Sequence, residues 1–287
     1  MFRLIIMLVL LTAFYMISNI EGDAISFDEG SDVKPEDYPF VVLIAGIIRK
    51  GNVKRVNRIG TGVLLTESWV LTAAHIFINL DKKKREILCV WYGEFTQSPF
   101  DTNMFTEVFQ LFVHPSFRKT SFISKDFFSC VNDVALLFIS KVYVVGCCGK
   151  LSSVNRAALL GLPAKYVGVA KSDHNQSEED VNRKLKFGSG VLTRCGPPVN
   201  QWSQNLLCVI PSCQNRWQKI SYTGSCGDPL FVADKIVGIY SLSFYHESSY
   251  LWTAFTPVDM YLDWMNHVMR VQVNMIRKNF QRKNTTI

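Results

Sequence analysis

Short apolar segments, separated by polar or glycine-bearing loops, are the feature that most constrains the fold of this chain. Four of them cover 40–48, 62–65, 134–139 and 236–242 and are rich in Val, Ile, Leu and Phe. Segments of this length and composition favour buried β-strands. Residues 258–280 differ, because their apolar side chains recur close to a period of 3.6, which predicts an α-helix. The sequence therefore predicts an all-β fold with a C-terminal helix.

The N-terminal residues 1–22 predict a secretory signal peptide. Arg3 precedes an apolar run that is too short to span a bilayer comfortably, and Gly22 provides a small residue for cleavage. An uncleaved anchor is the alternative interpretation. No second apolar run of membrane length follows, so we expect a secreted, extracellular protein that does not bind membranes. In a secreted chain the sequons at Asn175 and Asn284 predict glycosylation.

The rest of the chain is expected to form one globular domain. The 287 residues are 48% hydrophobic and show no internal repeat or low-complexity linker, and β proteins of this length commonly form one compact unit. We place the domain at 31–268, after a short segment at 23–30 and before a basic tail at 269–287.

Basic residues dominate the charge, which is formally +7, with clusters at 49–50, 54–58 and 82–85. A shared basic face would bind an acidic protein or a sulfated glycan, and an ordinary solvated surface is the alternative. We expect no nucleic-acid partner and no cofactor. The histidines outside the motifs described next have no ligand spacing, so no metal site is predicted.

Three motifs carry residues with catalytic potential. The segment 60–75 ends in TAAH, the segment 131–140 contains NDVALL, and the segment 224–230 reads GSCGDPL. They present a histidine, an aspartate and a thiol in that order. A histidine can take a proton from a nucleophile while a carboxylate orients the ring.

Together these motifs resemble the chymotrypsin-like serine peptidase family over about residues 27–267. The resemblance implies two six-stranded antiparallel β-barrels with a C-terminal α-helix, and it assigns catalytic roles to His75, Asp133 and Cys226. Cys226 replaces the family's serine, but a thiol is intrinsically more nucleophilic, so this change alone does not abolish catalysis. The backbone N–H groups of Gly224 and Cys226 would form the oxyanion hole.

The family's activation switch is expected to be missing. In cellular members, cleavage before Ile-Val-Gly-Gly frees an α-amino group that pairs with the carboxylate preceding the nucleophile. Here Ser225 replaces that carboxylate, and no Lys or Arg lies between Arg3 and Lys34. Asp228 replaces a glycine two positions after the nucleophile, so it adds a charge and a β-carbon where the backbone was permissive.

The substrate pocket of the family also changes. By position, the resemblance assigns its base to Ile220, its walls to Ser243 and Thr253, and the start of the substrate-binding strand to Ser241. Side chains on both walls above an apolar base would exclude Lys, Arg or Phe of a substrate. We therefore expect a narrowed or filled pocket.

Cysteine pairing is predicted only in part. The resemblance implies a disulfide between Cys195 and Cys208. Six cysteines allow 15 connectivities and the sequence does not choose among them; they are Cys89, Cys130, Cys147, Cys148, Cys213 and Cys226. An even number of cysteines favours a paired Cys226, whereas catalysis would need a free thiol, so both alternatives stay open.

These observations predict a secreted protease homologue with impaired or lost endopeptidase activity, which acts by binding a protein or peptide. An active endopeptidase that uses Cys226, His75 and Asp133 is the alternative. A third possibility is an effector in which the fold serves only as a binding module.

Overall fold

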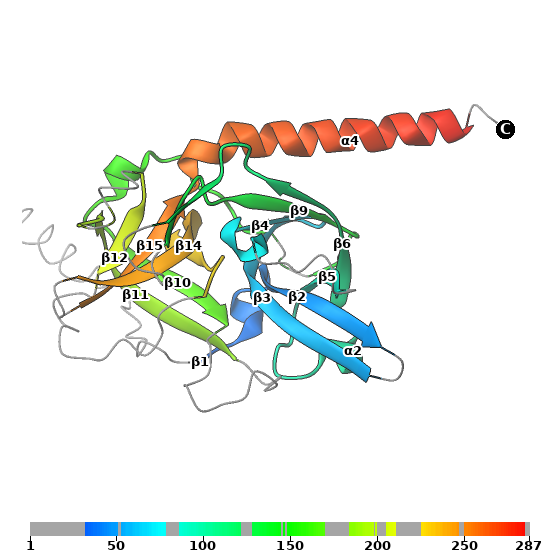
Figure 1. The fold of residues 1–287 in the computed structure, drawn as a ribbon, viewed down its shortest axis with the longest axis horizontal. Coiled ribbons are helices and arrows are strands. Elements are labelled where there is room, and N and C mark those ends of the chain that lie inside the picture. Colours follow the sequence, from blue (N-terminus) through cyan, green and yellow to red (C-terminus); the bar gives the residue numbers. More distant parts are fainter. Residues whose placement is uncertain are drawn as a thin grey trace, which may run out of the picture.

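The computed structural model describes residues 32–50, 53–78, 86–121, 128–144, 146, 148–169, 184–197, 199, 205–210, 225–246 and 250–284. The predicted signal peptide, the segment 23–30 and the sequon at Asn175 lie outside these residues and stay predictions. The described residues form two closed sheets and a long C-terminal helix (Figure 1). The predicted all-β architecture is therefore confirmed.

The first barrel is closed by six antiparallel strands in the order β2-β3-β4-β9-β6-β5. Their bounds are β2 Val41–Lys50, β3 Val53–Thr66, β4 Trp69–Thr72, β5 Glu86–Trp91, β6 Phe105–Val113 and β9 Ala135–Ile139. Both faces of the described start of β2 are apolar because each face packs into a different cluster. Val41 and Leu43 join a core that contains side chains of both barrels, while Val42 and Ile44 belong to a second core.

The second barrel contains β10 Pro163–Val169, β11 Leu185–Arg194, β12 Leu207–Ile210, β13 Pro229–Val232, β14 Lys235–His246 and β15 Tyr250–Pro257. Its order is β11-β10-β13-β14-β15-β12, and an additional β11–β12 pairing closes the ring. The short strand β1 Asp32–Val33 pairs with β11 at its edge. Two six-stranded barrels are therefore present, as the resemblance implied.

Short elements connect the barrels and lead into them. A two-stranded sheet joins β7 Arg118–Ser121 to β8 Phe128–Val131. The remaining single turns are η1 Pro35–Asp37, η2 His75–Phe77, α2 Pro99–Thr102, η3 Arg156–Leu159 and η5 Asp259–Tyr261. Of these, η2 begins at the candidate catalytic histidine.

The C-terminal helix α4 covers Leu262–Asn284. Met265 near its start is buried in the core shared by the two barrels, whereas the C-terminal end of α4 extends past the first barrel (Figure 1). The helix continues across residue 268, where we placed the end of the domain, and that boundary stays a prediction. No helix in the described part of the chain is long and apolar enough to cross a membrane.

The predicted disulfide between Cys195 and Cys208 is present. Their Cα atoms lie 5.0 Å apart, and the bridge closes a loop with a sequence separation of 13 residues. Cys195 follows β11 and Cys208 lies in β12, so the bridge ties together two strands that also pair in the sheet. A loop of this size contributes about 3 kcal/mol to stability in the chain-entropy picture.

Candidate active site

Neighbouring strand ends bring the histidine and the aspartate together. His75 follows β4 after two alanines, and Asp133 lies two residues before β9. In the ladder between these strands Thr72 is paired with Ala135. His75 and Asp133 flank the same end of these two adjacent antiparallel strands. They therefore lie close together in space, although they are 58 positions apart in sequence.

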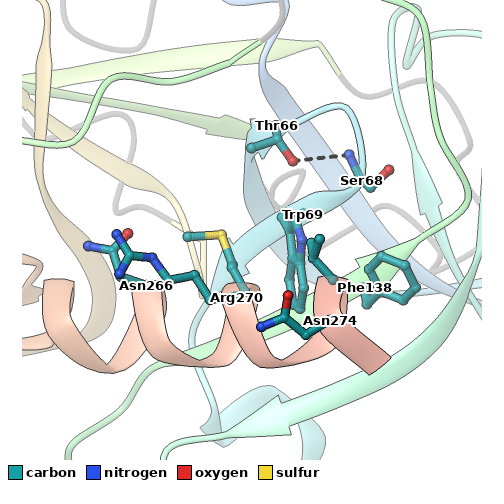
Figure 2. Close-up of a pocket in the computed structure, with 9 residues that line it drawn as sticks. Thr66, Ser68, Trp69, Phe138, Asn266, Arg270 and Asn274 are labelled. Atoms are coloured by element: carbon teal, nitrogen blue, oxygen red, sulfur yellow. Dashed lines mark hydrogen bonds between the residues drawn. The ribbon is translucent and has the colours of Figure 1, made fainter. Parts of the chain in front are cut away.

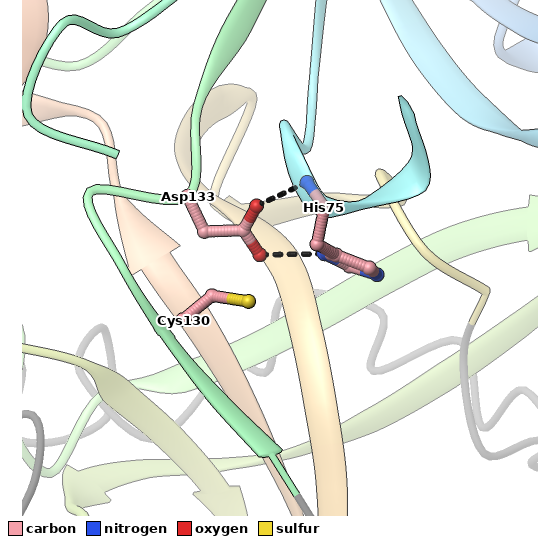
Figure 3. A group of neighbouring side chains, drawn as sticks. All are labelled: His75, Cys130 and Asp133. Atoms are coloured by element: carbon pink, nitrogen blue, oxygen red, sulfur yellow. Dashed lines mark hydrogen bonds and ion pairs between the residues drawn. The ribbon is translucent and has the colours of Figure 1, made fainter. Parts of the chain in front are cut away.

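Asp133 holds His75 at two points. The backbone N–H of His75 donates to Asp133 Oδ1 at 2.8 Å, and His75 Nδ1 lies 2.6 Å from Asp133 Oδ2 (Figure 3). The hydroxyl of Ser241 in β14 donates to the same Oδ2 at 2.5 Å. Asp133 itself is fully buried. These contacts direct the Nδ1–H of the ring towards the carboxylate, which accepts it, and leave Nε2 as the ring nitrogen available for chemistry.

The charge state of His75 follows from its surroundings. Burial lowers the pKa of His75, but the charge and hydrogen bond of Asp133, together with the hydrogen bond and charge of Cys226, raise it to about 10. The ring is therefore protonated at neutral pH. A protonated ring cannot take a proton from a hydroxyl, but it does stabilise a neighbouring thiolate.

Cys226 carries the candidate nucleophile between the two barrels. Its thiol is free and partly buried, and it hydrogen-bonds to the His75 side chain. Of the two alternatives left open by the sequence, the structure therefore has the free thiol. The three residues His75, Asp133 and Cys226 form one connected group, and the catalytic roles assigned to them from the sequence stay predictions.

Backbone hydrogen bonds fix the described part of the nucleophile loop, residues 225–228, to both barrels. Thr61 N–H in β3 donates to the Cys226 carbonyl at 2.8 Å, and Gly227 N–H donates to the Tyr240 carbonyl in β14 at 3.1 Å. Gly227 has φ +93°, and a Cβ there would lie 1.9 Å from the carbonyl oxygen of Thr61. The loop can therefore approach β3 this closely only with glycine at position 227.

A second thiol lies beside the triad. The donor atoms of His75, Cys130 and Asp133 all lie within 4.8 Å of one another (Figure 3). Burial, followed by the charge of Asp133, raises the pKa of Cys130 to about 12, so this thiol is neutral at neutral pH. Because the carboxylate already accepts three hydrogen bonds, we assign the group to orientation of the ring rather than to metal binding. The sequence did not single out Cys130, although it lies three positions before Asp133.

The predicted pocket walls come together in the structure. Ser243 in β14 pairs directly with Thr253 in β15, and Thr253 is buried. The Tyr240 hydroxyl lies 2.9 Å from Ser243 Oγ, so the Ser243 side chain is engaged at this wall. Gly224 and Ile220, predicted for the oxyanion hole and the pocket base, lie outside the described residues.

Another hollow, apart from the triad residues, lies between α4 and the first barrel. Figure 2 shows Trp69 and Phe138 facing Arg270 and Asn274 of the helix. Trp69 stacks against Phe138 with ring centroids 5.1 Å apart. Its lining includes the hydroxyl groups of Thr66 and Ser68 but no His, Cys, Asp, Glu or Lys that could activate them, so the triad remains the candidate site for chemistry.

Comparison with known proteins places these observations in a family. Two antiparallel barrels with a histidine, an aspartate and a nucleophile contributed in this order define the chymotrypsin-like class of peptidase folds. The family model described as Trypsin matches residues 28–265. The chain therefore belongs to the trypsin family.

Solved structures agree on the fold. One is a scabies mite inactivated protease paralogue, S-I1, with a TM-score of 0.56, 19% identity, and coverage of 85% of this chain and 99% of the other. Another is kallikrein-related peptidase 10 in complex with Zn²⁺, with a TM-score of 0.56, 20% identity, and coverage of 83% and 99%. At these identities the likeness shows the shared fold alone.

Proposed function

We propose that this protein is a secreted protease homologue that retains a thiol nucleophile, has impaired endopeptidase activity and acts mainly by binding a protein or peptide. The observation that carries the proposal is the arrangement in which Asp133 holds His75 and the free Cys226 thiol contacts the ring, whose pKa this arrangement raises. This arrangement supports acyl transfer to a thiol, because an imidazolium stabilises the thiolate and can later protonate the leaving group.

The substrate side of the site supports slow turnover. Ser243 and Thr253 lie opposite each other at the pocket walls, and the Ser243 hydroxyl is engaged by Tyr240. A wall with side chains restricts the size of the residue that a substrate can present. The scabies mite neighbour is described as an inactivated protease paralogue, which supports the idea that this scaffold can persist without proteolysis.

A fully active cysteine endopeptidase with specificity for small residues is the second candidate. It is favoured by the geometry of the triad, in which His75 Nδ1 and Asp133 Oδ2 lie 2.6 Å apart. The two candidates differ in rate rather than in mechanism. They can therefore be separated only by comparing the reactivity of the thiol with the turnover of peptides.

The experiment combines a thiol probe with a peptide library. The secreted chain is treated with an iodoacetamide probe, the label is mapped by mass spectrometry, and cleavage of a peptide library is measured beside Cys226→Ala. We expect rapid labelling at Cys226 with slow cleavage that the alanine variant abolishes. The variant Cys130→Ala is the matched control, because it removes the neighbouring thiol and should leave labelling at Cys226 intact.

Three results would decide against the proposal. Recovery of Cys226 in a disulfide removes the nucleophile. Library cleavage at rates typical of active peptidases, lost in Cys226→Ala, supports the second candidate instead. Cleavage that survives in Cys226→Ala assigns the activity to another group.

Secretion and the partner belong to the same proposal. The predicted signal peptide and the disulfide Cys195–Cys208 support an oxidising, extracellular location. The basic clusters at 49–50, 54–58 and 82–85 support an acidic protein or a sulfated glycan as a partner. Retention on a heparin column that stays unchanged after neutralisation of 82–85 would argue against that partner.

A further inference from the structure

We propose that Asp228 replaces the missing amino-terminal switch of the family: its carboxylate holds the nucleophile loop in one conformation, so that Cys226 is reactive in a chain that has not been cleaved. This inference rests on the proposed function, because it concerns the reactivity of the same thiol. Asp228 is a positioning residue, since it acts through the backbone on which Cys226 is carried.

Two hydrogen bonds between Ser225 and Asp228 close the loop around the nucleophile. The Ser225 N–H donates to Asp228 Oδ2 at 2.6 Å, and the Asp228 N–H donates back to the Ser225 carbonyl at 2.9 Å. The first is short because the acceptor is a carboxylate, and hydrogen bonds to charged groups are the stronger ones. The two bonds therefore hold together the residues that precede and follow Cys226 and Gly227.

The fold provides a dedicated space for this carboxylate. Asp228 is fully buried, and Gly168 lies beside it in β10. A Cβ at Gly168 would lie 1.8 Å from Asp228 Oδ1, so any larger residue at this position would collide with the carboxylate. The absence of a side chain at Gly168 and the presence of one at Asp228 are therefore complementary. A buried carboxylate is costly unless it accepts hydrogen bonds, and the loop itself supplies one.

The other anchors of the loop also lie within the folded barrels. Thr61 N–H binds the Cys226 carbonyl, Gly227 N–H binds the Tyr240 carbonyl, and Tyr240 N–H donates to the Asp228 carbonyl at 2.8 Å. None of these partners is a chain terminus. The contacts of residues 225–228 can therefore form without a newly created amino group.

The position of the Asp228 carboxylate relative to Cys226 explains how the loop keeps its conformation without an inserted ammonium group. In the family the carboxylate immediately precedes the nucleophile and needs an inserted ammonium group as its partner. Here that position is Ser225, and the carboxylate has moved to the other side of Cys226, where it accepts the N–H of Ser225. A carboxylate that accepts a hydrogen bond from its own loop does not depend for that bond on cleavage elsewhere in the chain.

The test compares intact and cleaved protein. The full chain is prepared with an enterokinase site before residue 27, and the rate of Cys226 alkylation by iodoacetamide is followed from pH 5 to pH 9 before and after cleavage. Asp228→Ala removes the acceptor, while Asp228→Asn keeps an acceptor oxygen of the same size. Thermal unfolding is recorded for each variant, and hydrogen exchange reports the protection of the Ser225 amide.

In the wild type we expect the same alkylation rate before and after cleavage. We expect Asp228→Ala to lower that rate at least about tenfold and to speed exchange at Ser225 by a similar factor, because a hydrogen bond to a charged group is lost. Asp228→Asn should stay within about threefold of the wild type, because its amide oxygen still accepts the bond.

Either of two results would overturn the inference: a rise of tenfold or more on cleavage of the wild type, or an unchanged alkylation rate and unchanged Ser225 protection in folded Asp228→Ala. If Asp228→Ala does not fold, the comparison of intact with cleaved wild type decides alone. If Cys226 is unreactive in every form, the proposed function fails. The exchange of the Ser225 amide then still decides whether Asp228 holds the loop.

Discussion

Replacing Asp133 by asparagine removes a buried charge from the site while keeping the size of the side chain. In the wild type the carboxylate bonds to His75 at 2.6 Å and helps to raise the pKa of His75 to about 10. The gap between this value and the ordinary 6.5 corresponds to about 5 kcal/mol in favour of the protonated ring. Without the charge, burial dominates, so we expect the pKa of His75 in Asp133→Asn to fall towards or below 6.5.

The sign of the effect on stability follows from linkage. Because the folded-state pKa of His75 lies above the unfolded value, its stabilisation is present in full below pH 6.5 and is lost as the pH rises through about 10. The free energy of unfolding of the wild type should therefore fall by up to about 5 kcal/mol over this range. Asp133→Asn should lack this fall in the free energy of unfolding. Because its other titrating groups are the same as in the wild type, the variant shows how much of the fall those groups cause.

Two measurements check this prediction. Urea denaturation at pH 6 and pH 10 gives the free energy of unfolding of both proteins, and NMR titration of the His75 ring gives its pKa directly. The reasoning is refuted if His75 titrates near 6.5 in the wild type. It is also refuted if the two proteins lose the same stability between the two pH values.

Three further outcomes follow from the same contacts. Cys226→Ser should not restore a serine peptidase: Cys226 is a smaller cause of the raised pKa of His75 than Asp133, which remains, so the ring should stay mostly protonated at pH 7 and hydrolysis of a fluorogenic ester should stay at least about tenfold below wild type; equal rates would show that the serine meets a neutral ring. Replacing Cys195 and Cys208 by serine should lower the free energy of unfolding in urea by about 3 kcal/mol, and an unchanged midpoint would contradict the bridge. Gly227→Ala places a Cβ against a backbone carbonyl at φ +93°, so it should lower the free energy of unfolding in urea by at least about 2 kcal/mol and slow Cys226 alkylation. A stable, reactive variant would show that the loop can move away from β3.

The fold was predictable because its signal is distributed over many residues. The apolar segment at 40–48 became β2 and the periodic segment at 258–280 became most of α4, since burial of strand faces and of one helix face leaves a pattern that survives divergence. The proximity of His75 and Asp133 was predictable for a different reason. His75 and Asp133 lie in motifs whose neighbours are themselves buried strand residues, so the motif and the fold constrain each other.

The contacts that tune the site were less predictable. The Ser241 hydroxyl was expected on the substrate strand, yet it also donates to Asp133, and this depends on how β14 passes the first barrel. The free state of Cys226 could not be derived, because connectivity among six cysteines is a property of three-dimensional distances. The role of Asp228 depends on the path of four backbone residues and on the missing side chain of Gly168 in a distant strand.

The substitutions around the nucleophile are best understood as dependent on one another. A hydroxyl nucleophile requires a neutral histidine, whereas a thiol works with a protonated one. Asp133 is a larger cause of the raised pKa of His75 than Cys226, so a serine at position 226 would still meet a mostly protonated ring at neutral pH, and the thiol suits this electrostatic environment. In the same way Ser225 dispenses with an inserted ammonium only because Asp228 accepts its N–H. Replacing Cys226 by serine should therefore lower reactivity, even though this reversion moves the sequence towards the family pattern.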